Sequence, residues 1–209
     1  MSGVSHILGV ILAGGSARRM GGGDKGLADL GGRPMLAHVI QRFGRQAGGL
    51  ILNANGSPDR FSGFGLTVVP DTEFEGNGPM SGLIAAMAWA ERASPPFLAV
   101  ATVTTDVPFL PLDLIARLAA AIGEGRPVIA TSGGQSHPTI GLWPCALKPK
   151  LQAALARTEL SLGAFAQQHE AIAVPFPFSE SGGVRIDPFF NANTPEDLDE
   201  ARALLAHCL

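Results

Sequence analysis

The chain has 209 residues, a length that suits one domain with a sizeable hydrophobic core. It is 46% hydrophobic and 16% charged, which is typical of a globular protein and excludes a disordered one. A formal net charge of −3 gives no sign of a surface that binds nucleic acid or anionic membranes. We therefore expect a single domain over residues 1–209 that binds no nucleic acid and no membrane.

We expect no targeting or membrane-spanning segment. Residues Met1–His6 lack a basic region, and the apolar stretch Ile7–Ala13 breaks at Gly14-Gly15, too early for a signal peptide or a span. The two cysteines, Cys145 and Cys208, lie far apart and form no CxxC motif. We expect a cytoplasmic protein with reduced thiols.

Apolar runs alternate with helical patterns along the chain. Strands are expected at Ile7–Leu12, Leu50–Leu52, Leu66–Val69, Pro96–Val103, Pro127–Ala130, Thr139–Trp143, Ile172–Val174 and Pro188–Phe190. Helices are expected at Pro34–Ala47, Met80–Arg92, from Pro111, at Leu147–Ala156, at Leu162–His169 and from Thr194 to the end. This order predicts an α/β fold, a three-layer sandwich with a mainly parallel sheet.

Polar residues follow four of the expected strands. They are the Gly-rich stretch after Leu12, and then Asn53, Asp71 and Asp106. Each of them alone is equally compatible with an ordinary turn or helix cap. Because ligands of open α/β sheets bind at the carboxyl ends of the strands, the four together favour a ligand site.

The stretch from Leu12 to Gly26 is rich in glycine and carries Arg19 and Lys25. Glycines let backbone N–H groups approach a phosphate, and the two cations add charged donors. No Gly-x-Gly-x-x-Gly follows the strand, which argues against a dinucleotide fingerprint. Lys25 precedes Gly26 instead of Ser or Thr, which rejects a Walker motif.

Short segments of a recognisable kind occur in order along nearly the whole chain. They are Leu12-Ala13-Gly14-Gly15, Arg19-Met20-Gly21, Asp24-Lys25-Gly26, Asn53-Ala54-Asn55, Asp71, Gly78-Pro79-Met80-Ser81-Gly82, Asp106-Val107-Pro108, His137-Pro138 and Asn191-Ala192-Asn193-Thr194-Pro195-Glu196-Asp197. Together they resemble the molybdenum cofactor guanylyltransferases, which belong to a wider sugar-nucleotidyltransferase-like superfamily. The resemblance implies a nucleotide-diphospho-sugar transferase-like, Rossmann-like version of the predicted fold.

The resemblance also implies a reaction. The terminal phosphate of molybdopterin attacks the α-phosphate of GTP, pyrophosphate leaves, and Mg²⁺ is the cofactor. GTP and molybdopterin are then the small-molecule partners, and other cofactor-biosynthesis proteins and acceptor molybdoenzymes are further candidates. Because the nucleophile is already anionic, the protein has to align anions and neutralise charge more than to supply a strong base.

The resemblance assigns roles residue by residue. The expected catalytic residues are Lys25, Arg19 and Asp106, and Asp106 is also the expected Mg²⁺ ligand. The expected nucleotide-binding residues are Leu12, Ala13, Gly14, Gly15, Lys25, Asn53, Asp71, Gly78 and Asp106. His137, expected in a loop after a strand, is a candidate for the molybdopterin side together with Asn191 and Asn193. Thr102–Thr105 replaces the Pro-Cys of many relatives, and we expect this departure to touch no residue with a charge role.

Two rival functions remain open at this point. The chain is also compatible with a CTP-dependent molybdopterin cytidylyltransferase or a sugar-phosphate nucleotidyltransferase. It is further compatible with a non-catalytic nucleotide-binding assembly protein, although the presence of Lys25 and Asp106 argues against lost turnover. The Gly14-Gly15 pair resembles the guanylyl branch, whereas the cytidylyl branch usually shows Ala-Ala-Gly there, so we expect GTP to be preferred over CTP and ATP.

Overall fold

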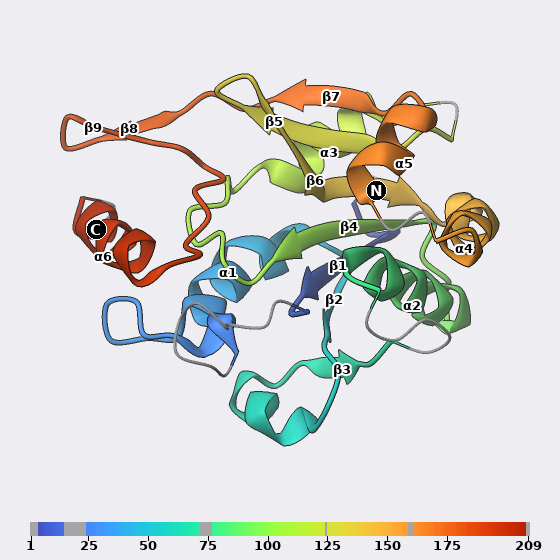
Figure 1. Cartoon of the computed structure of the whole chain (residues 1–209), viewed down its shortest axis with the longest axis horizontal. Helices are drawn as coiled ribbons and strands as arrows, with labels where there is room; N and C mark the ends of the chain where they lie inside the picture. Colours follow the sequence, from blue (N-terminus) through green and yellow to red (C-terminus); the bar gives the residue numbers. More distant parts are fainter. Residues whose placement is uncertain (1–3, 15–23, 72–76, 124, 159–160, 208–209) are drawn as a thin grey trace.

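The computed structural model describes residues 4–14, 24–71, 77–123, 125–158 and 161–207. Its main sheet contains β1 (Ile7–Leu12), β2 (Gly49–Asn53), β3 (Thr67–Val69), β4 (Ala99–Thr104), β5 (Val128–Ser132), β6 (Gln135–Pro144) and β7 (Ile172–Pro175). The strands lie in the order β3-β2-β1-β4-β6-β5-β7 (Figure 1). β6 pairs antiparallel with β4 and β5, while the other neighbouring pairs are parallel. The predicted mainly parallel sheet is therefore confirmed.

Helices cover both faces of this sheet. The helices are α1 (Met35–Phe43), α2 (Pro79–Arg92), α3 (Leu114–Ala121), α4 (Lys148–Ala156), α5 (Leu162–Gln168) and α6 (Pro195–Leu205), with short 3-10 helices η2 (Lys25–Leu27), η3 (Gly44–Gln46), η4 (Pro58–Phe64) and η5 (Cys145–Leu147). α1 and α3 pack on one face, and α2, α4 and α5 pack on the other. The predicted three-layer sandwich is confirmed.

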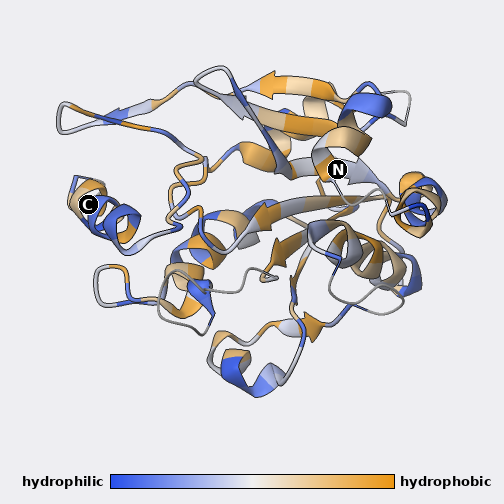
Figure 2. Cartoon of the chain, in the orientation of Figure 1, coloured by the Kyte–Doolittle hydropathy of each residue, from blue (hydrophilic) through white to orange (hydrophobic). Residues whose placement is uncertain are grey.

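The alternation of side chains along β1 explains why two helical layers form. Ile11 joins the cluster that includes Leu36 of α1, whereas Val10 joins the cluster that includes Met80 and Leu83 of α2. Successive residues of a strand point to opposite faces, so an all-apolar strand needs a cover on both. Figure 2 shows β1 and β7 largely in hydrophobic colours and more hydrophilic colours on α6.

Beyond the main sheet, β8 (Ser179–Ser181) and β9 (Val184–Ile186) form a hairpin that was not predicted from the sequence. Gly182 and Gly183 turn between them with φ of 58° and 78°, the left-handed backbone that such a two-residue turn needs. The hairpin lies at the same end of the molecule as α6 (Figure 1), and Ile186 shares a buried cluster with Leu198 of α6.

Three other sequence-based expectations need correction. The strand expected at Pro188–Phe190 is wrong, because the chain turns there and Phe190 N–H donates to Asp187 C=O at 3.1 Å. The helix expected from Pro111 begins at Leu114. The loop expected between β5 and β6 is a two-residue turn at Gly133-Gly134, so both strands are longer and His137 lies in β6. In the described part of the chain, no helix has the length and apolar character that crossing a bilayer requires.

Candidate functional site

A cavity of about 270 Å³ lies at the carboxyl ends of β1, β2, β3 and β4. Five of the predicted nucleotide-binding residues line it: Leu12, Gly14, Asn53, Asp71 and Gly78. Three residues without a predicted site role also line it: Asn55, Thr104 and Thr139. The parallel strands bring these segments together because they end at one edge of the sheet.

Asn53, Asn55 and Asp71 form one network in the wall of this cavity. Asn53 Nδ2 donates to Val69 C=O and to Asp71 Oδ1, both at 3.0 Å. Asn55 Nδ2 donates to Asp71 Oδ2 at 2.9 Å, and Asn55 Oδ1 accepts from Asp71 N–H at 2.8 Å. Both carboxylate oxygens are thus fixed by amides, so Asp71 presents its negative charge in one orientation.

Gly82 of α2 lies directly against Asn53. A Cβ at this position would lie 2.1 Å from Asn53 Oδ1 and 3.0 Å from Leu12 Cδ2. Asn53 is 5% exposed, so its side chain has little room to move away. The close approach of α2 to β2 therefore requires glycine and sets the position of the Asn53 amide.

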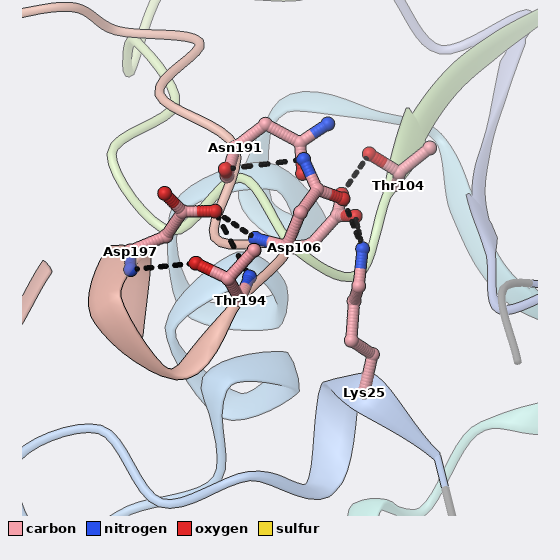
Figure 3. A network of polar contacts seen from close by, with 7 residues as sticks. Lys25, Thr104, Asp106, Asn191, Thr194 and Asp197 are labelled. Atoms are coloured by element: carbon pink, nitrogen blue, oxygen red, sulfur yellow. Dashed lines mark hydrogen bonds and ion pairs between the residues drawn. The ribbon is translucent and has the colours of Figure 1, made fainter. Parts of the chain in front are cut away.

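A second cluster lies beside the cavity, around Asp106 (Figure 3). Lys25 Nζ donates to Asp106 Oδ2 at 2.9 Å, and the same ammonium contacts Asn193 Oδ1. Lys25 begins η2 and Asp106 follows β4, so residues 81 positions apart in sequence meet here. The structure brings these two predicted catalytic residues into direct contact.

Asn191 and Asn193 approach Asp106 from the segment before α6. Ala192 N–H donates to Asp106 C=O at 3.0 Å, which ties this segment to the end of β4. With its amide nitrogen turned toward Asp106, Asn191 donates to Oδ2 at 2.7 Å. A reciprocal capping box between Thr194 and Asp197 starts α6, and Asp197 also accepts from Asn193 N–H at 2.8 Å. The helix start therefore holds both asparagines at the carboxylate.

Thr104 connects the cavity with the Asp106 cluster. Its hydroxyl donates to Asp106 Oδ1 at 2.6 Å, and its side chain also lines the cavity. The expectation that the Thr102–Thr105 segment touches no residue with a charge role is therefore wrong. Thr105 is also close to the Gly-rich stretch, because a Cβ on Gly26 would lie 2.8 Å from Thr105 Cβ. Thr104 precedes Asp106 by only two positions in the sequence, and this spacing could have predicted their contact.

The oxygens around Asp106 fit a hard divalent cation. They are the Asp106 carboxylate and the side-chain carbonyl of Asn193, with no histidine or thiol among these side chains. The Asn191 side-chain carbonyl faces away from Asp106 when its nitrogen donates to the carboxylate, and it would join these oxygens only if the amide turned over. The Lys25 ammonium already contacts two of these side chains as a cation. Among the described residues, no group of three or more His, Cys, Asp or Glu side chains could hold a metal ion. Any metal here would therefore keep several waters, as Mg²⁺ commonly does.

His137 lies farther along the same edge of the sheet. Its Nε2 is 2.8 Å from Ser132 Oγ, which is also 2.8 Å from Asp187 Oδ1. Burial lowers the pKa of His137, and the Asp187 carboxylate opposes part of that shift. The Phe189 ring packs against the imidazole with centroids 4.9 Å apart.

The remaining predicted residues divide into two groups. Ala13 N–H donates to Asn53 C=O at 2.8 Å, so its backbone joins the ends of β1 and β2. Gly15 and Arg19 lie outside the described residues.

A larger cavity, of about 620 Å³, lies next to His6, Trp89 and Phe97, and none of the predicted site residues lines it.

Comparisons with known proteins agree with this geometry. A model of the MobA-like NTP transferase domain matches residues 9–172. A protein of Bradyrhizobium sp. (strain ORS 278) named molybdenum cofactor guanylyltransferase is 46% identical over 201 residues, covering 95% of this chain and 92% of that protein. A molybdenum cofactor guanylyltransferase of Mesorhizobium japonicum is 45% identical over 202 residues, covering 95% of this chain and 96% of that protein.

Solved structures share the fold. The crystal structure of molybdopterin-guanine dinucleotide biosynthesis protein A from Archaeoglobus fulgidus superposes with a TM-score of 0.73 at 17% identity, covering 96% of this chain and 98% of that one. This likeness confirms the nucleotide-diphospho-sugar transferase-like, Rossmann-like fold that the sequence predicted. Together with the matched domain and the relatives, it places the chain: it belongs to the MobA-like NTP transferase family.

Proposed function

We propose that this chain transfers GMP from GTP to the terminal phosphate of molybdopterin, forming the molybdopterin guanine dinucleotide and releasing pyrophosphate. The relatives named molybdenum cofactor guanylyltransferase support this activity over the cytidylyl, sugar-phosphate and non-catalytic alternatives. The observation that carries the proposal is the contact of two sites through Thr104. A cavity of the right kind for a nucleoside adjoins a cluster of one lysine, one carboxylate and two asparagines.

The cavity suits a guanine base. Guanine presents its N1–H and its exocyclic amine as neighbouring hydrogen-bond donors. The acceptors that would pair with them are the fixed Asp71 carboxylate, the Asn53 side-chain carbonyl and backbone carbonyls. Adenine has an unprotonated N1 on the corresponding edge, which a carboxylate repels. A buried mismatch of this kind costs about 1–3 kcal/mol, enough for a preference of about tenfold or more. Leu12, Ala13, Gly14, Gly15 and Gly78 are proposed to surround the nucleoside.

Lys25 and Asp106 are proposed to act on the phosphates. Lys25 would leave Asp106 and donate to the triphosphate, joined by Arg19 and the Gly-rich backbone. Asp106 would hold Mg²⁺, with Asn191 or Asn193 as a neighbouring oxygen ligand. When bound, the metal would neutralise charge on the phosphates as the pyrophosphate leaves. When Mg²⁺ replaces the Lys25 ammonium at Asp106, the carboxylate stays paired with a positive charge at every stage.

The acceptor needs alignment more than activation. Its terminal phosphate is already an anionic nucleophile, so the chain has to hold it near the α-phosphate and limit repulsion. Asn191 and Asn193, which are predicted for the molybdopterin side, lie at Asp106 and can serve the metal, the incoming phosphate or both. No general base is assigned.

The proposal is tested by pyrophosphate release from GTP with purified chain, Mg²⁺ and molybdopterin. GTP-dependent release that stops on chelation of the metal and on omission of molybdopterin supports it. Release with CTP and none with GTP would replace it by the cytidylyl reaction. A cytoplasmic location belongs to the proposal and agrees with Cys145, which is buried and unbridged. Delivery proteins and acceptor molybdoenzymes remain predicted partners.

A further inference from the structure

His137, Ser132 and Asp187 form a hydrogen-bonded chain in which each proton can be assigned. Ser132 Oγ lies 2.8 Å from both His137 Nε2 and Asp187 Oδ1. An ionised carboxylate only accepts, so Ser132 donates its single proton to Asp187. Ser132 must then accept from His137, which places the ring proton on Nε2 and leaves Nδ1 of the neutral ring as an acceptor.

The surroundings hold this arrangement in place. Ser132 is 3% exposed, and Asp187 Oδ1 also accepts from Phe189 N–H at 2.9 Å. The Phe189 ring packs on the imidazole and, with centroids 5.2 Å apart, on Phe176. Among the residues that the structure describes, none hydrogen-bonds Nδ1 of His137. A fixed acceptor with no assigned partner suggests a ligand.

The position of His137 indicates which ligand. Pairing between β4 and β6 ends at Thr102 and Gly141, so the earlier residues of β6 continue beyond the paired part of β4 toward the Asp106 edge. Thr139 in this extension lines the nucleotide cavity. From Asp187 the chain runs within four residues to Asn191, which lies at Asp106. His137 thus belongs to the wall that continues from the phosphate cluster away from the nucleoside.

We propose that His137 Nδ1 accepts a hydrogen bond from a ring N–H or amino group of the pterin in the acceptor substrate. This inference rests on the proposed function, since it names a contact of that same acceptor. A pterin carries N–H and amino donors, whereas its phosphate carries only acceptors at neutral pH. The contact orients the ring and so directs the distant phosphate toward the α-phosphate. Ser132 and Asp187 are positioning residues that fix the His137 tautomer.

Two substitutions separate this role from a purely structural one. His137→Asn keeps a side-chain oxygen near the Nδ1 position but loses the donor to Ser132. His137→Gln keeps a donor that reaches Ser132 but loses the Nδ1 acceptor. Loss of one neutral hydrogen bond predicts an increase of about tenfold in the KM for molybdopterin in His137→Gln, with the KM for GTP unchanged. His137→Asn should remain closer to the wild type.

His169→Gln is the matched control, because His169 lies at the end of α5 against Phe165 and lines none of the site. It should leave both KM values unchanged. A raised KM for molybdopterin in His137→Asn together with a normal KM in His137→Gln would overturn the proposal. That result would show that the role of His137 is its hydrogen bond to Ser132. Equal increases in the KM for GTP and for molybdopterin would overturn it as well.

A tautomer measurement keeps the test independent of how the variants fold. Nitrogen-15 NMR of the ring in the wild type should show Nε2 protonated, and addition of molybdopterin should shift Nδ1. A ring protonated on Nδ1 would overturn the inference. If the wild type releases no pyrophosphate from GTP and molybdopterin, the proposed function fails. If turnover is normal and the Nδ1 signal does not respond to molybdopterin, only this inference fails.

Discussion

Replacement of Gly82 by alanine should weaken GTP binding without unfolding the protein. The added Cβ would lie 2.1 Å from Asn53 Oδ1 and 2.8 Å from Asn53 Cγ, distances that no folded structure tolerates. The buried Asn53 side chain has little room, but it can rotate about its bonds and the α2 backbone cannot, so the clash turns this side chain out of its present orientation. Rotation removes the Asn53 Nδ2 hydrogen bonds to Val69 C=O and Asp71 Oδ1.

The magnitude follows from these two bonds. At a net value of about 1 kcal/mol each, their loss costs about 2 kcal/mol and releases Asp71 from its fixed orientation. Because the proposed contact with GTP needs Asp71 in its original orientation, this cost falls on the complex and lowers GTP affinity about 30-fold. Alanine in place of glycine inside α2 gains about 1 kcal/mol of helix propensity, which offsets part of the loss of stability. Binding should therefore suffer more than the melting temperature.

Calorimetric titration of GTP with Mg²⁺ measures the affinity, and thermal unfolding measures stability. Gly63→Ala is the control, because a Cβ there meets no atom within 4 Å. In a double-mutant cycle, Gly82→Ala and Asn53→Ala should be strongly non-additive, since both remove the same amide contacts. Additive losses, or normal GTP affinity in a folded Gly82→Ala protein, would refute the assignment of Asn53 and Asp71 to the nucleotide.

Three further predictions concern charge. Lys25→Ala should lower turnover by about 10²-fold while the fold is retained, because one preorganised cationic donor to the phosphates is lost; near-normal pyrophosphate release would remove its catalytic role. Asp106→Asn should be nearly as damaging, since a neutral amide oxygen is a poorer ligand for a hard dication, and an unchanged Mg²⁺ titration of the rate would contradict this. Burial lowers the pKa of His137 below its usual 6.5, so the unfolded chain binds this proton more readily than the folded one. The neutral His137 therefore contributes to the free energy of unfolding. This contribution is fully present above about pH 6.5 and is lost as the pH falls through the lower pKa of the folded state. Urea unfolding should therefore show a larger loss on acidification in the wild type than in His137→Gln, and equal losses would show that the shift is absent.

The strands that were predicted well from the sequence are those covered on both faces, because such strands consist almost entirely of apolar residues. β1 is fully buried, and its run Ile7–Leu12 coincides with the observed strand. The errors fall where local pattern and three-dimensional context differ. Pro188–Phe190 is apolar because Phe189 packs on His137 and Phe176, although its backbone turns. The Gly182-Gly183 pair was a signal for the missed hairpin, but β8 is polar throughout and the apolar-polar-apolar alternation of β9 covers only three residues, fewer than a strand pattern needs.

The site could be predicted only as far as strand ends can be identified. Asn53 ends β2, Asp71 and Asp106 come two residues after β3 and β4, and a parallel sheet brings such positions together. The contact of Lys25 with Asn193 spans 168 residues, and no local pattern encodes it. It depends on the α6 capping box and on the Ala192 bond to Asp106, which appear only in the folded chain.

Pyrophosphate release with each of the four nucleoside triphosphates in turn, in the presence of Mg²⁺ and molybdopterin, is the most direct measurement of the proposed reaction. Release should require GTP, molybdopterin and the metal together, with GTP favoured over CTP and ATP by about tenfold or more, and it should fall sharply in Asp106→Asn. Equal rates with GTP and CTP, or release that persists in Asp106→Asn, would contradict a guanylyl transfer directed by this site.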